Sequence, residues 1–551
     1  MATVTWDQEA DVIVVGSGGS ALTAAILAHD HGARVLVLEK SDKVGGTTAV
    51  SGGGVWVPLN HHMKDLGAQD SREEALTYCK RLTAGRAPDE LVETFVDTAH
   101  QMVRYLEEKT PVRFVATSLP DYQAEFEGGK TAGRTLDQEF FAARELGEWA
   151  AKLRPSPLMF VPLSMEEALK SMGNPASVPM EKVVQRMEQG LVGAGNALIG
   201  RLLRGCLDRG ITISSQTRAR RLVMEDGRVV GLVAEQNGRD LGLRAHGGVV
   251  LACGGFEWNA QLWSQFQPTV ITHRCSPPHN EGDGLLMAME AGADLGNMSE
   301  AWLYPGAVIP GEEHEGLPVS RWVIGERTLP HSLMVNRYGQ RFTNEGANYN
   351  DMAKALYAYD PNRLEFRNLP CWCIMDSQFR QRYPILTVMP TDFDPDWLPK
   401  GESLEDLAQR VGIDSDGLRA TVERFNGFAR NGKDEEFRRG ESAYERWMGD
   451  PNSAHPNLGT VEKPPFYALP VHVAAAGTKG GPRTNSRGEV LNVRGDVIPG
   501  LYAAGNTMAG ISGPGYYGGG GTIGLGMTWG YISGINAANA ARGGQPRSPA
   551  R

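Results

Sequence analysis

The sequence predicts an α/β fold in which a parallel sheet with helices and a β-meander is interrupted by an inserted α+β domain. At the N-terminus a strand, a glycine-rich turn, a helix and a second strand follow one another directly, which is typical of a parallel βαβ unit. A second glycine-rich stretch returns after Pro464, and residues 298–463 between them carry aromatic-rich strands, surface loops and charged helices. We therefore divide the chain into a first domain at 1–297 and 464–551 and an inserted catalytic domain at 298–463.

Composition limits the classes of protein that this chain can belong to. Of the 551 residues 41% are hydrophobic and 22% are charged, which is enough for more than one core and argues against wholesale disorder. The net charge of −10 has the wrong sign for a nucleic-acid binder. The 6 cysteines show neither a disulfide framework nor metal-ligand spacing, so we expect a reducing, cytoplasmic location and no metal. We also predict no transmembrane helix and no signal peptide.

Hydrophobic periodicity and the positions of glycines between apolar runs predict the elements of the first domain. Short apolar runs bounded by glycine are typical of buried strands, whereas apolar residues three and four positions apart are typical of helices. The pair Asp226-Gly227 is a hairpin turn signal. In chain order we predict a strand at 11–16, a helix at 20–28, a strand at 34–39, helices over 72–107 and 191–209, a strand meander over 211–255 and a short helix at 286–292.

The first turn carries a dinucleotide-binding fingerprint. The run from Gly16 to Ala21 reads GxGxxA, follows a strand, opens a helix and is followed after about 20 residues by Glu39 at the end of the next strand. Gly16 permits the tight turn, Gly18 lets backbone N–H groups approach a pyrophosphate, and Ala21 lets helix and strand pack closely. Glu39 is positioned to accept hydrogen bonds from a ribose. The first domain is therefore predicted to be Rossmann-like.

Two further glycine-rich loops favour a flavin over a nicotinamide cofactor. Gly45–Thr48 and Ser51–Gly54 follow Glu39 at once, and Gly505-Asn506 precede another glycine-rich turn and a helix expected to begin near Thr522. A nicotinamide enzyme needs neither loop, whereas a flavin extended along the sheet needs both. The N-terminus of the last helix would also stabilise negative charge on the reduced ring. We therefore predict FAD as the cofactor.

The last helix has a second interpretation. Val497 to Ala541 carry no charge, and Gly526, Gly530 and Gly534 form a stripe of small residues like those in paired membrane helices. Polar asparagines follow, and the apolar portion is short, so close packing beside the flavin is favoured.

These residues together resemble the fumarate reductase/succinate dehydrogenase flavoprotein superfamily over nearly the whole chain. The likeness rests on the fingerprint, on Gly45-Gly-Thr-Thr48, on Gly254-Gly255 after a strand and on Gly500-Leu-Tyr-Ala-Ala-Gly505. Within the superfamily, the segments Thr48 to Asn60, Arg341-Phe-Thr-Asn-Glu345 and Gly505 to Met508 are similar to 3-ketosteroid Δ1-dehydrogenases. Those enzymes remove hydrogens from C1 and C2 of a 3-ketosteroid and pass a hydride to FAD. The resemblance thus implies an FAD-dependent oxidoreductase of steroid degradation.

The resemblance also implies a catalytic set of Tyr122, Tyr349, Tyr516 and Gly520. Tyr122 ends a Pro-Asp-Tyr segment, Tyr349 stands at the family's offset after Glu345, and the other two lie in one glycine-rich turn. Here Tyr517 departs from the pattern, because a proline is common at its position. Tyr516 and the Gly520 N–H would hold the ketone as enolate charge develops, while Tyr349 takes the C2 proton with help from Tyr122.

The expected cofactor site combines the fingerprint with the resemblance. No histidine lies between Ala21 and Ala28 or between Glu39 and Asn60, where a covalent link would need one, so FAD is expected to be non-covalent. Its expected binding residues are Gly16, Gly18, Gly19, Ser20, Ala21, Glu39, Lys40, Gly46, Thr47, Thr48, Ser51, Gly52, Gly53, Gly54, Ala219, Ala252, Gly254, Gly505, Asn506, Gly521, Thr522 and Ile523.

Three alternatives stay open at this stage. A Δ4-(5α)-dehydrogenase shares the flavin, the ketone and a related fold. A fumarate reductase is less favoured, because the segment Ala476 to Gly481 lacks the histidine with which those enzymes hold a dicarboxylate. A flavin-binding subunit without activity would not need the tyrosine set.

Three remaining features are interpreted as structural, and a fourth keeps two interpretations. Cys371 and Cys373 are interpreted as core packing, His61-His62 as a solvated turn, and Asp283 between two glycines as a turn former. Segment 146–190 contains an apolar run and a capping box at Ser164, and is either a core-covering insertion or a lid that contacts a membrane. The expected partners are a 3-ketosteroid, an external electron acceptor such as a quinone, and no nucleic acid.

Overall fold

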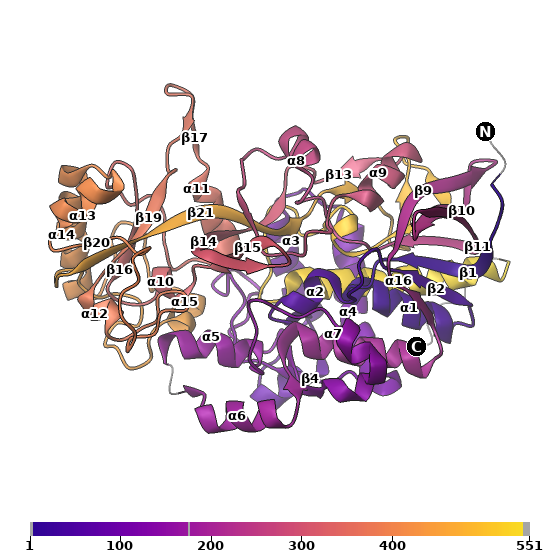
Figure 1. The fold of residues 1–551 in the computed structure, drawn as a ribbon, viewed down its shortest axis with the longest axis horizontal. Helices are drawn as coiled ribbons and strands as arrows, with labels where there is room; N and C mark the ends of the chain where they lie inside the picture. Colours follow the sequence, from indigo (N-terminus) through magenta and orange to yellow (C-terminus); the bar gives the residue numbers. More distant parts are fainter. Residues whose placement is uncertain (1–3, 175–176, 544–551) are drawn as a thin grey trace.

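The N-terminal apolar runs form the parallel centre of the first sheet in the computed structural model, which describes residues 4–174 and 177–543. Along the sheet the strand order is β23-β24-β11-β1-β2-β8, and β9 and β10 extend β11 as an antiparallel meander. This sheet lies at the right of Figure 1. The predicted α/β fold with a parallel sheet and a meander is confirmed. The strands are β1 Gln8–Val15, β2 Val35–Leu38, β8 Thr212–Ser214, β9 Thr217–Glu225, β10 Arg228–Gln236, β11 Arg239–Leu251, β23 Glu489–Leu491 and β24 Val497–Ala503.

Small residues let the last helix, α16 (Gly521–Ala541), pack directly on α1 (Gly19–Asp30). A Cβ at Gly530 would collide with the Ser20 carbonyl, and one at Gly534 would collide with the Ala24 carbonyl. The small-residue stripe therefore serves packing between these helices, as predicted. No helix in the described part of the chain combines the length and apolarity that a membrane span requires.

The predicted helical stretch 72–107 is confirmed and consists of two helices. α3 (Arg72–Thr83) ends where Ala84 and Gly85 adopt φ of 48° and 73°, and α4 (Asp89–Lys109) begins after Pro88. Left-handed residues end a helix, and a proline cannot continue one, so the chain reverses here. The predicted turn at Asp226-Gly227 is confirmed between β9 and β10.

A second sheet forms the other end of the molecule (Figure 1). Its order is β15-β14-β21-β19-β16, and β12 and β20 also pair with β21. β21 (Phe466–Thr478) is its central strand, although it follows the predicted boundary at 464. Strand pairing therefore joins the inserted region to the segment after it, and the three domain limits stay a prediction. The other strands are β12 His273–Arg274, β14 Ala301–His314, β15 Leu317–Trp322, β16 Ser332–Asn336, β19 Cys371–Asp376 and β20 Lys400–Gly401.

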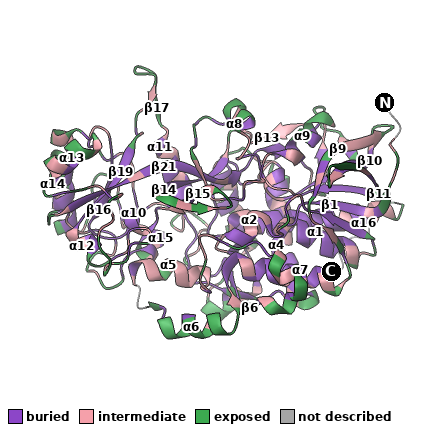
Figure 2. Cartoon of the chain, viewed as in Figure 1, coloured by how far each residue is buried: buried purple, intermediate pink, exposed green. Residues whose placement is uncertain are grey.

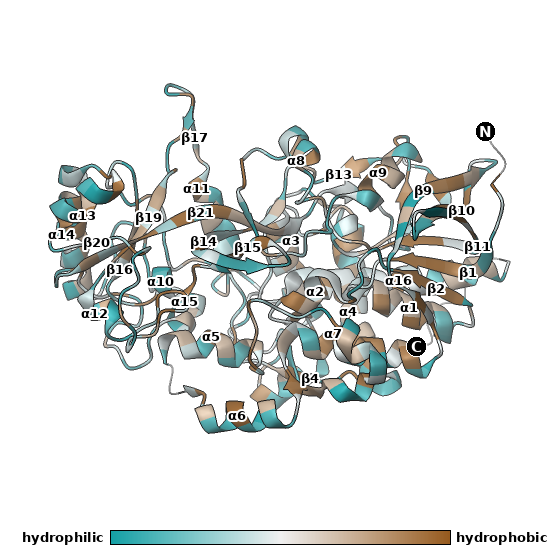
Figure 3. Cartoon of the chain, in the orientation of Figure 1, coloured by the Kyte–Doolittle hydropathy of each residue, from teal (hydrophilic) through white to brown (hydrophobic). Residues whose placement is uncertain are grey.

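Helices cover both faces of the second sheet and bury its apolar side chains. Cys371 and Cys373 lie in a hydrophobic cluster on β19, which confirms their interpretation as core. Figures 2 and 3 show that the strands of both sheets are largely buried and apolar, whereas α6 on the lower edge is exposed. The covering helices are α10 Gly325–Thr328, α11 Tyr349–Leu356, α12 Ser377–Arg380, α13 Leu404–Val411 and α14 Ser415–Asn431, whereas α15 Ala443–Met448 packs against α10 and α5.

The remaining elements are short sheets and helices outside the two main sheets. Short sheets pair β3 with β5 and β4, β6 with β7, β13 with β22, and β17 with β18. They are β3 Val55–Trp56, β4 Phe114–Ala116, β5 Thr135–Gln138, β6 Phe141–Ala142, β7 Leu191–Val192, β13 Leu295–Gly296, β17 Tyr359–Asp360, β18 Glu365–Phe366 and β22 Gly481–Pro482. The helices are α2 Gly46–Val50, η1 His61–Leu66, η2 Ala143–Lys152, α5 Met165–Gly173, α6 Met180–Glu188, α7 Ala194–Asp208, α8 Ala260–Phe266, α9 Asp283–Glu290 and η4 Gly505–Thr507.

Candidate active site

One large cavity runs from the glycine-rich turns of the first sheet to the base of the second. Its volume is about 720 Å³. Twenty of the predicted cofactor residues line it, and Ala21 and Gly521 do not. Ala21 is fully buried, as the predicted packing role requires, and Gly521 is the first residue of α16. The same cavity reaches Tyr122, Tyr349, Tyr516 and Gly520.

The turn after β1 has the shape that a pyrophosphate requires. Gly16 has a φ of 107°, and a Cβ there would collide with the Ala252 carbonyl. Gly18 is the N-cap of α1, so the positive end of that helix faces the cavity. Ser17, which the sequence analysis did not select, donates to Glu39 at 2.5 Å and accepts from the Gly45 N–H at 3.0 Å. It therefore ties the first glycine-rich turn to the second.

Glu39 ends β2 as a buried carboxylate. It accepts from Ser17 and, at 2.8 Å, from the Ser41 N–H, which leaves lone pairs on both oxygens for a ribose. Burial raises the pKa of Glu39, whereas those hydrogen bonds and the charges of Arg154 and Lys40 lower it. Buried carboxylates are costly without partners, so an additional donor such as a ribose hydroxyl would favour this arrangement.

The second glycine-rich loop meets a buried polar network beside the dinucleotide end of the cavity. Asn280 donates to Thr47 Oγ1 at 2.8 Å and to the buried carboxylate of Glu257 at 2.7 Å. A Cβ at Gly254 would lie 2.5 Å from the Asn280 side chain. Asn280 lines the cavity and was missed, because nothing in its local sequence marks it. The glycine cradle, the buried acid and the two helix N-termini all fit FAD.

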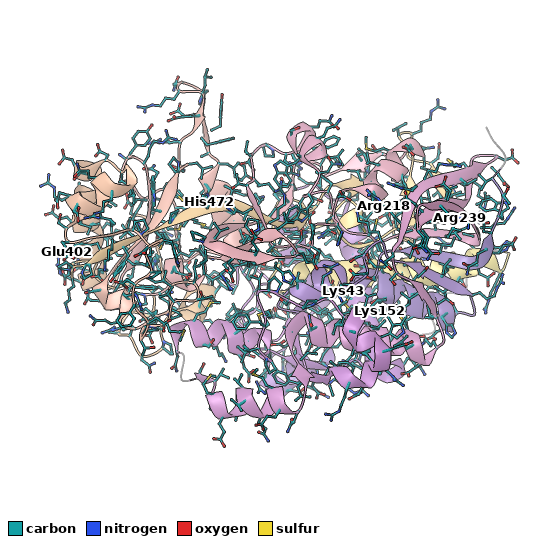
Figure 4. The ribbon with its side chains drawn as sticks, in the orientation of Figure 1. Lys43, Lys152, Arg218, Arg239, Glu402 and His472 are labelled. Carbon is teal, nitrogen blue, oxygen red and sulfur yellow. The ribbon has the colours of Figure 1, made fainter. Side chains whose placement is uncertain are left out.

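An ion-pair cluster closes the ribose side of the cavity. Asp283 begins α9 and pairs with Lys40 at 2.9 Å and with Arg218 at 2.6 Å. Arg218 is labelled in Figure 4 and projects from β9. Asp283 is therefore a cavity-lining ion-pair partner, rather than only the turn former that its flanking glycines suggested.

Three tyrosines from distant segments meet at the other end of the cavity. Tyr122 follows β4, Tyr349 is the first residue of α11, and Tyr516 precedes α16. Their ring centroids are 5.1 to 5.6 Å apart. Tyr444 of α15, which the sequence analysis missed, packs 5.0 Å from Tyr122 and also lines the cavity. The structure thus brings the predicted tyrosines together, and their individual roles stay predictions.

The surroundings of Tyr516 differ from those of Tyr349. Thr522 Oγ1 donates to the Tyr516 hydroxyl at 3.1 Å, and this bond and one from Tyr349 lower the pKa of Tyr516, although burial raises it more. For Tyr349, burial, its neighbours Tyr122 and Tyr516 and its hydrogen bonds to both all raise the pKa well above the usual value. Help from Tyr122 in the ionisation of Tyr349 therefore stays a prediction.

The turn before α16 resolves which of two adjacent tyrosines faces the cavity. Tyr516 lines it, whereas Tyr517 is fully buried against Trp56 at 5.1 Å. Gly520 has a φ of 85°, and a Cβ there would collide with the backbone of Gly54. Its N–H has no acceptor among the described residues and is free to bind a ketone oxygen.

Buried Lys479 holds the loop that carries Tyr516. Its ammonium donates to the carbonyls of Gly513, Pro514 and Gly515 at 3.2, 3.3 and 2.8 Å. It lies 4.0 Å from the Trp302 ring, which in turn packs 4.5 Å from the Tyr516 ring. Burial lowers the pKa of Lys479 to about 7. No spacing signal in the sequence marked this residue.

We expect Lys479→Met to lower kcat by up to about 10²-fold, because a small displacement of a positioned group has an effect of that size. The change removes the donor to the Gly513 and Gly515 carbonyls, whereas the Pro514 carbonyl keeps its bonds from Lys354 and Asn350, so the loop before Tyr516 is held less firmly. FAD content should stay near that of the wild type, since Lys479 does not line the cofactor cavity. Lys152→Met is the control, because Lys152 (labelled in Figure 4) ends η2 and does not line the cavity. An unchanged kcat in Lys479→Met would refute this positioning role.

Apolar side chains form the wall opposite the tyrosines. Segment 146–190 contributes Leu158, Met159, Phe160, Met165, Ala168, Leu169 and Met172, mostly from the face of α5. The predicted capping box at Ser164 is confirmed at the start of that helix. Ile324, Leu329, Leu386 and Met389 continue the wall from the second sheet's connections. The site thus offers ketone donors at one end of a long apolar channel.

Known proteins resemble this chain over almost its entire length. A family model described as FAD binding domain matches residues 11–523. A 4-oxocyclohexanecarboxylate 2-dehydrogenase of Sinomonas cyclohexanicum is 38% identical, with 97% of this chain and 93% of that protein covered. A 3-oxosteroid 1-dehydrogenase of Mycobacterium tuberculosis is 36% identical, with 97% and 99% covered.

The fold of this chain is also similar to that of a solved structure. The 3-ketosteroid delta1-dehydrogenase from Sterolibacterium denitrificans, in complex with 1,4-androstadiene-3,17-dione, superposes with a TM-score of 0.90 at 36% identity. The match covers 96% of this chain and 99% of that one.

Proposed function

This chain belongs to the FAD binding domain family, and from that premise we propose that it is an FAD-dependent 3-ketosteroid Δ1-dehydrogenase. The observation that carries the proposal is the convergence of Tyr349, Tyr516 and the free Gly520 N–H on a cavity continuous with the dinucleotide site. When bound, FAD supplies the hydride acceptor. The relatives named above that act on steroids, and the solved structure with a steroid bound, support this substrate class.

The chain's own residues acidify the carbon next to a ketone. Tyr516 and the Gly520 N–H donate to the ketone oxygen, and both interactions strengthen as negative charge develops on it. Tyr349 takes the C2 proton in its phenolate form, after its own hydroxyl proton has been lost to solvent, and Tyr122 can donate a hydrogen bond to that phenolate. The apolar wall excludes water, which strengthens each of these interactions.

The size of the substrate is the point on which the relatives differ. The 38% identical relative is named for a small cyclohexanone acid, whereas the 36% identical one is named for a steroid. Both need a double bond introduced beside a six-ring ketone. Among the described residues three Lys or Arg side chains line the cavity, and each already has a carboxylate partner: Lys40 with Asp283, Arg321 with Glu312 and Arg154 with Glu315. A long apolar wall without a free cation favours the steroid.

Anaerobic addition of substrate tests the proposal. A Δ4 3-ketosteroid should bleach the oxidised flavin absorbance, and the product should carry a new C1–C2 double bond. Bleaching by 4-oxocyclohexanecarboxylate but not by the steroid would contradict the steroid proposal and support the alternative. A new double bond at C4–C5 from a saturated ketosteroid would instead assign Δ4-(5α) chemistry. The non-covalent state of FAD stays a prediction, which release of flavin by acid precipitation would check.

We further propose that segment 146–190 contacts a membrane at the mouth of the channel. Phe160 lines the cavity yet is 68% exposed. On α6, Met180, Val184 and Met187 form one exposed apolar stripe at helical spacing. Such a stripe suits an interface with lipid, in which sterols and quinones dissolve. A cytoplasmic location, with a quinone or a similar external electron acceptor, is part of the same proposal.

Replacing that stripe should separate membrane contact from chemistry. We expect the Met180→Ser, Val184→Ser, Met187→Ser triple variant to lose co-flotation with phospholipid vesicles. Its turnover of a detergent-dispersed steroid should be unchanged, because none of the three residues lines the cavity. Val270→Ser with Phe393→Ser removes exposed apolar residues elsewhere and serves as the control. Equal flotation of the wild type and the triple variant would contradict the membrane contact.

A further inference from the structure

Two adjacent histidines and a glutamate converge away from the cavity. His61 and His62 begin η1, and Glu107 lies in the last turn of α4. His61 Nε2 is 3.1 Å from one oxygen of Glu107, and His62 Nε2 is 2.9 Å from the other. All three side chains are largely buried, with exposed fractions of 26%, 17% and 14%. The two histidines are thus half-buried and directed at Glu107, whereas Lys64 and Asp65 of the same turn are exposed.

The spacing of these atoms is that of ligands around one metal ion. One ligand atom from each residue can be chosen so that all three lie within 4.8 Å of one another. Ligand atoms of a tetrahedral site with bonds of about 2.0 to 2.1 Å are about 3.3 Å apart, close to the two distances above. Two imidazoles and a carboxylate, with a fourth position open to water, are a frequent zinc ligand set.

Ion pairing alone explains this arrangement less well. The two imidazole rings have centroids 4.1 Å apart, so two imidazolium charges would repel each other strongly at this distance. His246 and Glu9 show the ordinary alternative, in which one histidine meets one exposed carboxylate at 3.1 Å. A divalent cation would satisfy both neutral imidazoles of His61 and His62 and the carboxylate together.

Neighbouring groups already orient two of the three ligands. The Phe114 N–H donates to Glu107 at 3.0 Å, and Asp65 lies 3.5 Å from Nδ1 of His62. A carboxylate or backbone group on the far side of each ligand is what metal sites commonly show. The charges of Arg104 and Lys64 also reach His61 and reduce the affinity for a cation.

We propose that His61, His62 and Glu107 bind one divalent transition-metal ion, of the Zn²⁺ class. The ion would join η1 to α4 and to the start of β4, and would act as a structural link rather than in catalysis. Imidazole ligands favour zinc, cobalt or nickel over magnesium or calcium. The segment that follows η1 leads to Asp70, which pairs with buried Arg134 at 2.6 Å, so the link anchors a connection of the core.

Calorimetric titration of the chelator-treated holoenzyme with ZnCl₂ tests the proposal. The wild type should bind one ion per chain, and its unfolding temperature should rise with the zinc concentration. Titration with CoCl₂ should add an absorption band at longer wavelengths than the flavin, and MgCl₂ should give neither effect. FAD content and steroid turnover should be unchanged, because the three residues do not line the cavity.

Matched variants make each outcome decisive. His61→Gln and His62→Gln should each weaken zinc binding by at least about tenfold, the lower limit for losing a supporting group of a metal site. Glu107→Gln should do the same and still accept from the Phe114 N–H, which keeps the fold. His246→Gln should bind zinc as the wild type does. Absent binding in the wild type, or equal binding in the three ligand variants, would overturn the proposal.

Discussion

Tyr349→Phe is expected to lower kcat by about 10²- to 10⁴-fold, the usual contribution of a positioned base. The variant keeps the ring that packs 4.5 Å from Trp322 and loses only the hydroxyl that takes the C2 proton. Tyr516 and Gly520 still bind the ketone, so the affinity for a steroid product should change little. Burial holds the pKa of Tyr349 above its ordinary value of 10.0, so the deprotonated fraction grows with pH throughout the neutral range. In the wild type kcat should therefore rise with pH, and in Tyr349→Phe this rise should disappear.

The measurement for Tyr349 is anaerobic exchange of deuterium at C2, followed together with flavin reduction across pH. Tyr357→Phe is a matched control, because Tyr357 ends the same helix and does not line the cavity. Exchange at the wild-type rate in Tyr349→Phe would show that the base is another residue, and Tyr122 would be the next to change.

The second large effect is expected for Tyr516→Phe, at about 10²- to 10³-fold in kcat, which is typical for the loss of one donor to a developing oxyanion. Affinity for the ketone should fall as well, since the hydroxyl also contacts the ground state. The Gly520 N–H remains as a donor, so residual turnover should persist. This combined loss of affinity and turnover distinguishes Tyr516 from Tyr349, for which turnover alone should fall.

Tyr517→Phe is the control for that experiment. Tyr517 is adjacent in sequence and buried, and its hydroxyl lies 3.5 Å from the Ile511 carbonyl outside the cavity. It should keep wild-type affinity for the ketone. If Tyr516→Phe bound the steroid as tightly as the wild type and Tyr517→Phe did not, the two assignments would be exchanged.

The dinucleotide site was predictable from sequence because its determinants are local. Gly16, Gly18 and Glu39 lie within one βαβ unit, where the backbone geometry of a turn and the length of a helix set their separation. Gly16 has a φ of 107°, a backbone conformation that favours glycine in any surroundings, and Ala21 is fully buried in the helix of this unit. The stripe of glycines in α16 was likewise predictable as a packing surface, because small residues at helical spacing permit close approach.

The catalytic end was predictable only through a resemblance. Tyr122, Tyr349 and Tyr516 are far apart in the sequence, and the chain holds 15 tyrosines, so no periodicity distinguishes these three. The family motifs selected them, and the structure brought them together. The choice between Tyr516 and Tyr517 needed coordinates, because adjacent residues of a loop point in directions that spacing does not specify.

The sequence by itself therefore determined the fold class, the cofactor and the first glycine-rich turn, since short-range backbone geometry and hydrophobic pattern decide these features. Tertiary structure alone decided that β21 completes the second sheet, that Lys479 holds the Tyr516 loop, and that Glu107 meets two histidines. Each of these contacts joins residues from separate elements. Such contacts depend on how the elements pack. The free energy that selects one packing comes from contacts throughout the core, so no local sequence pattern determines it.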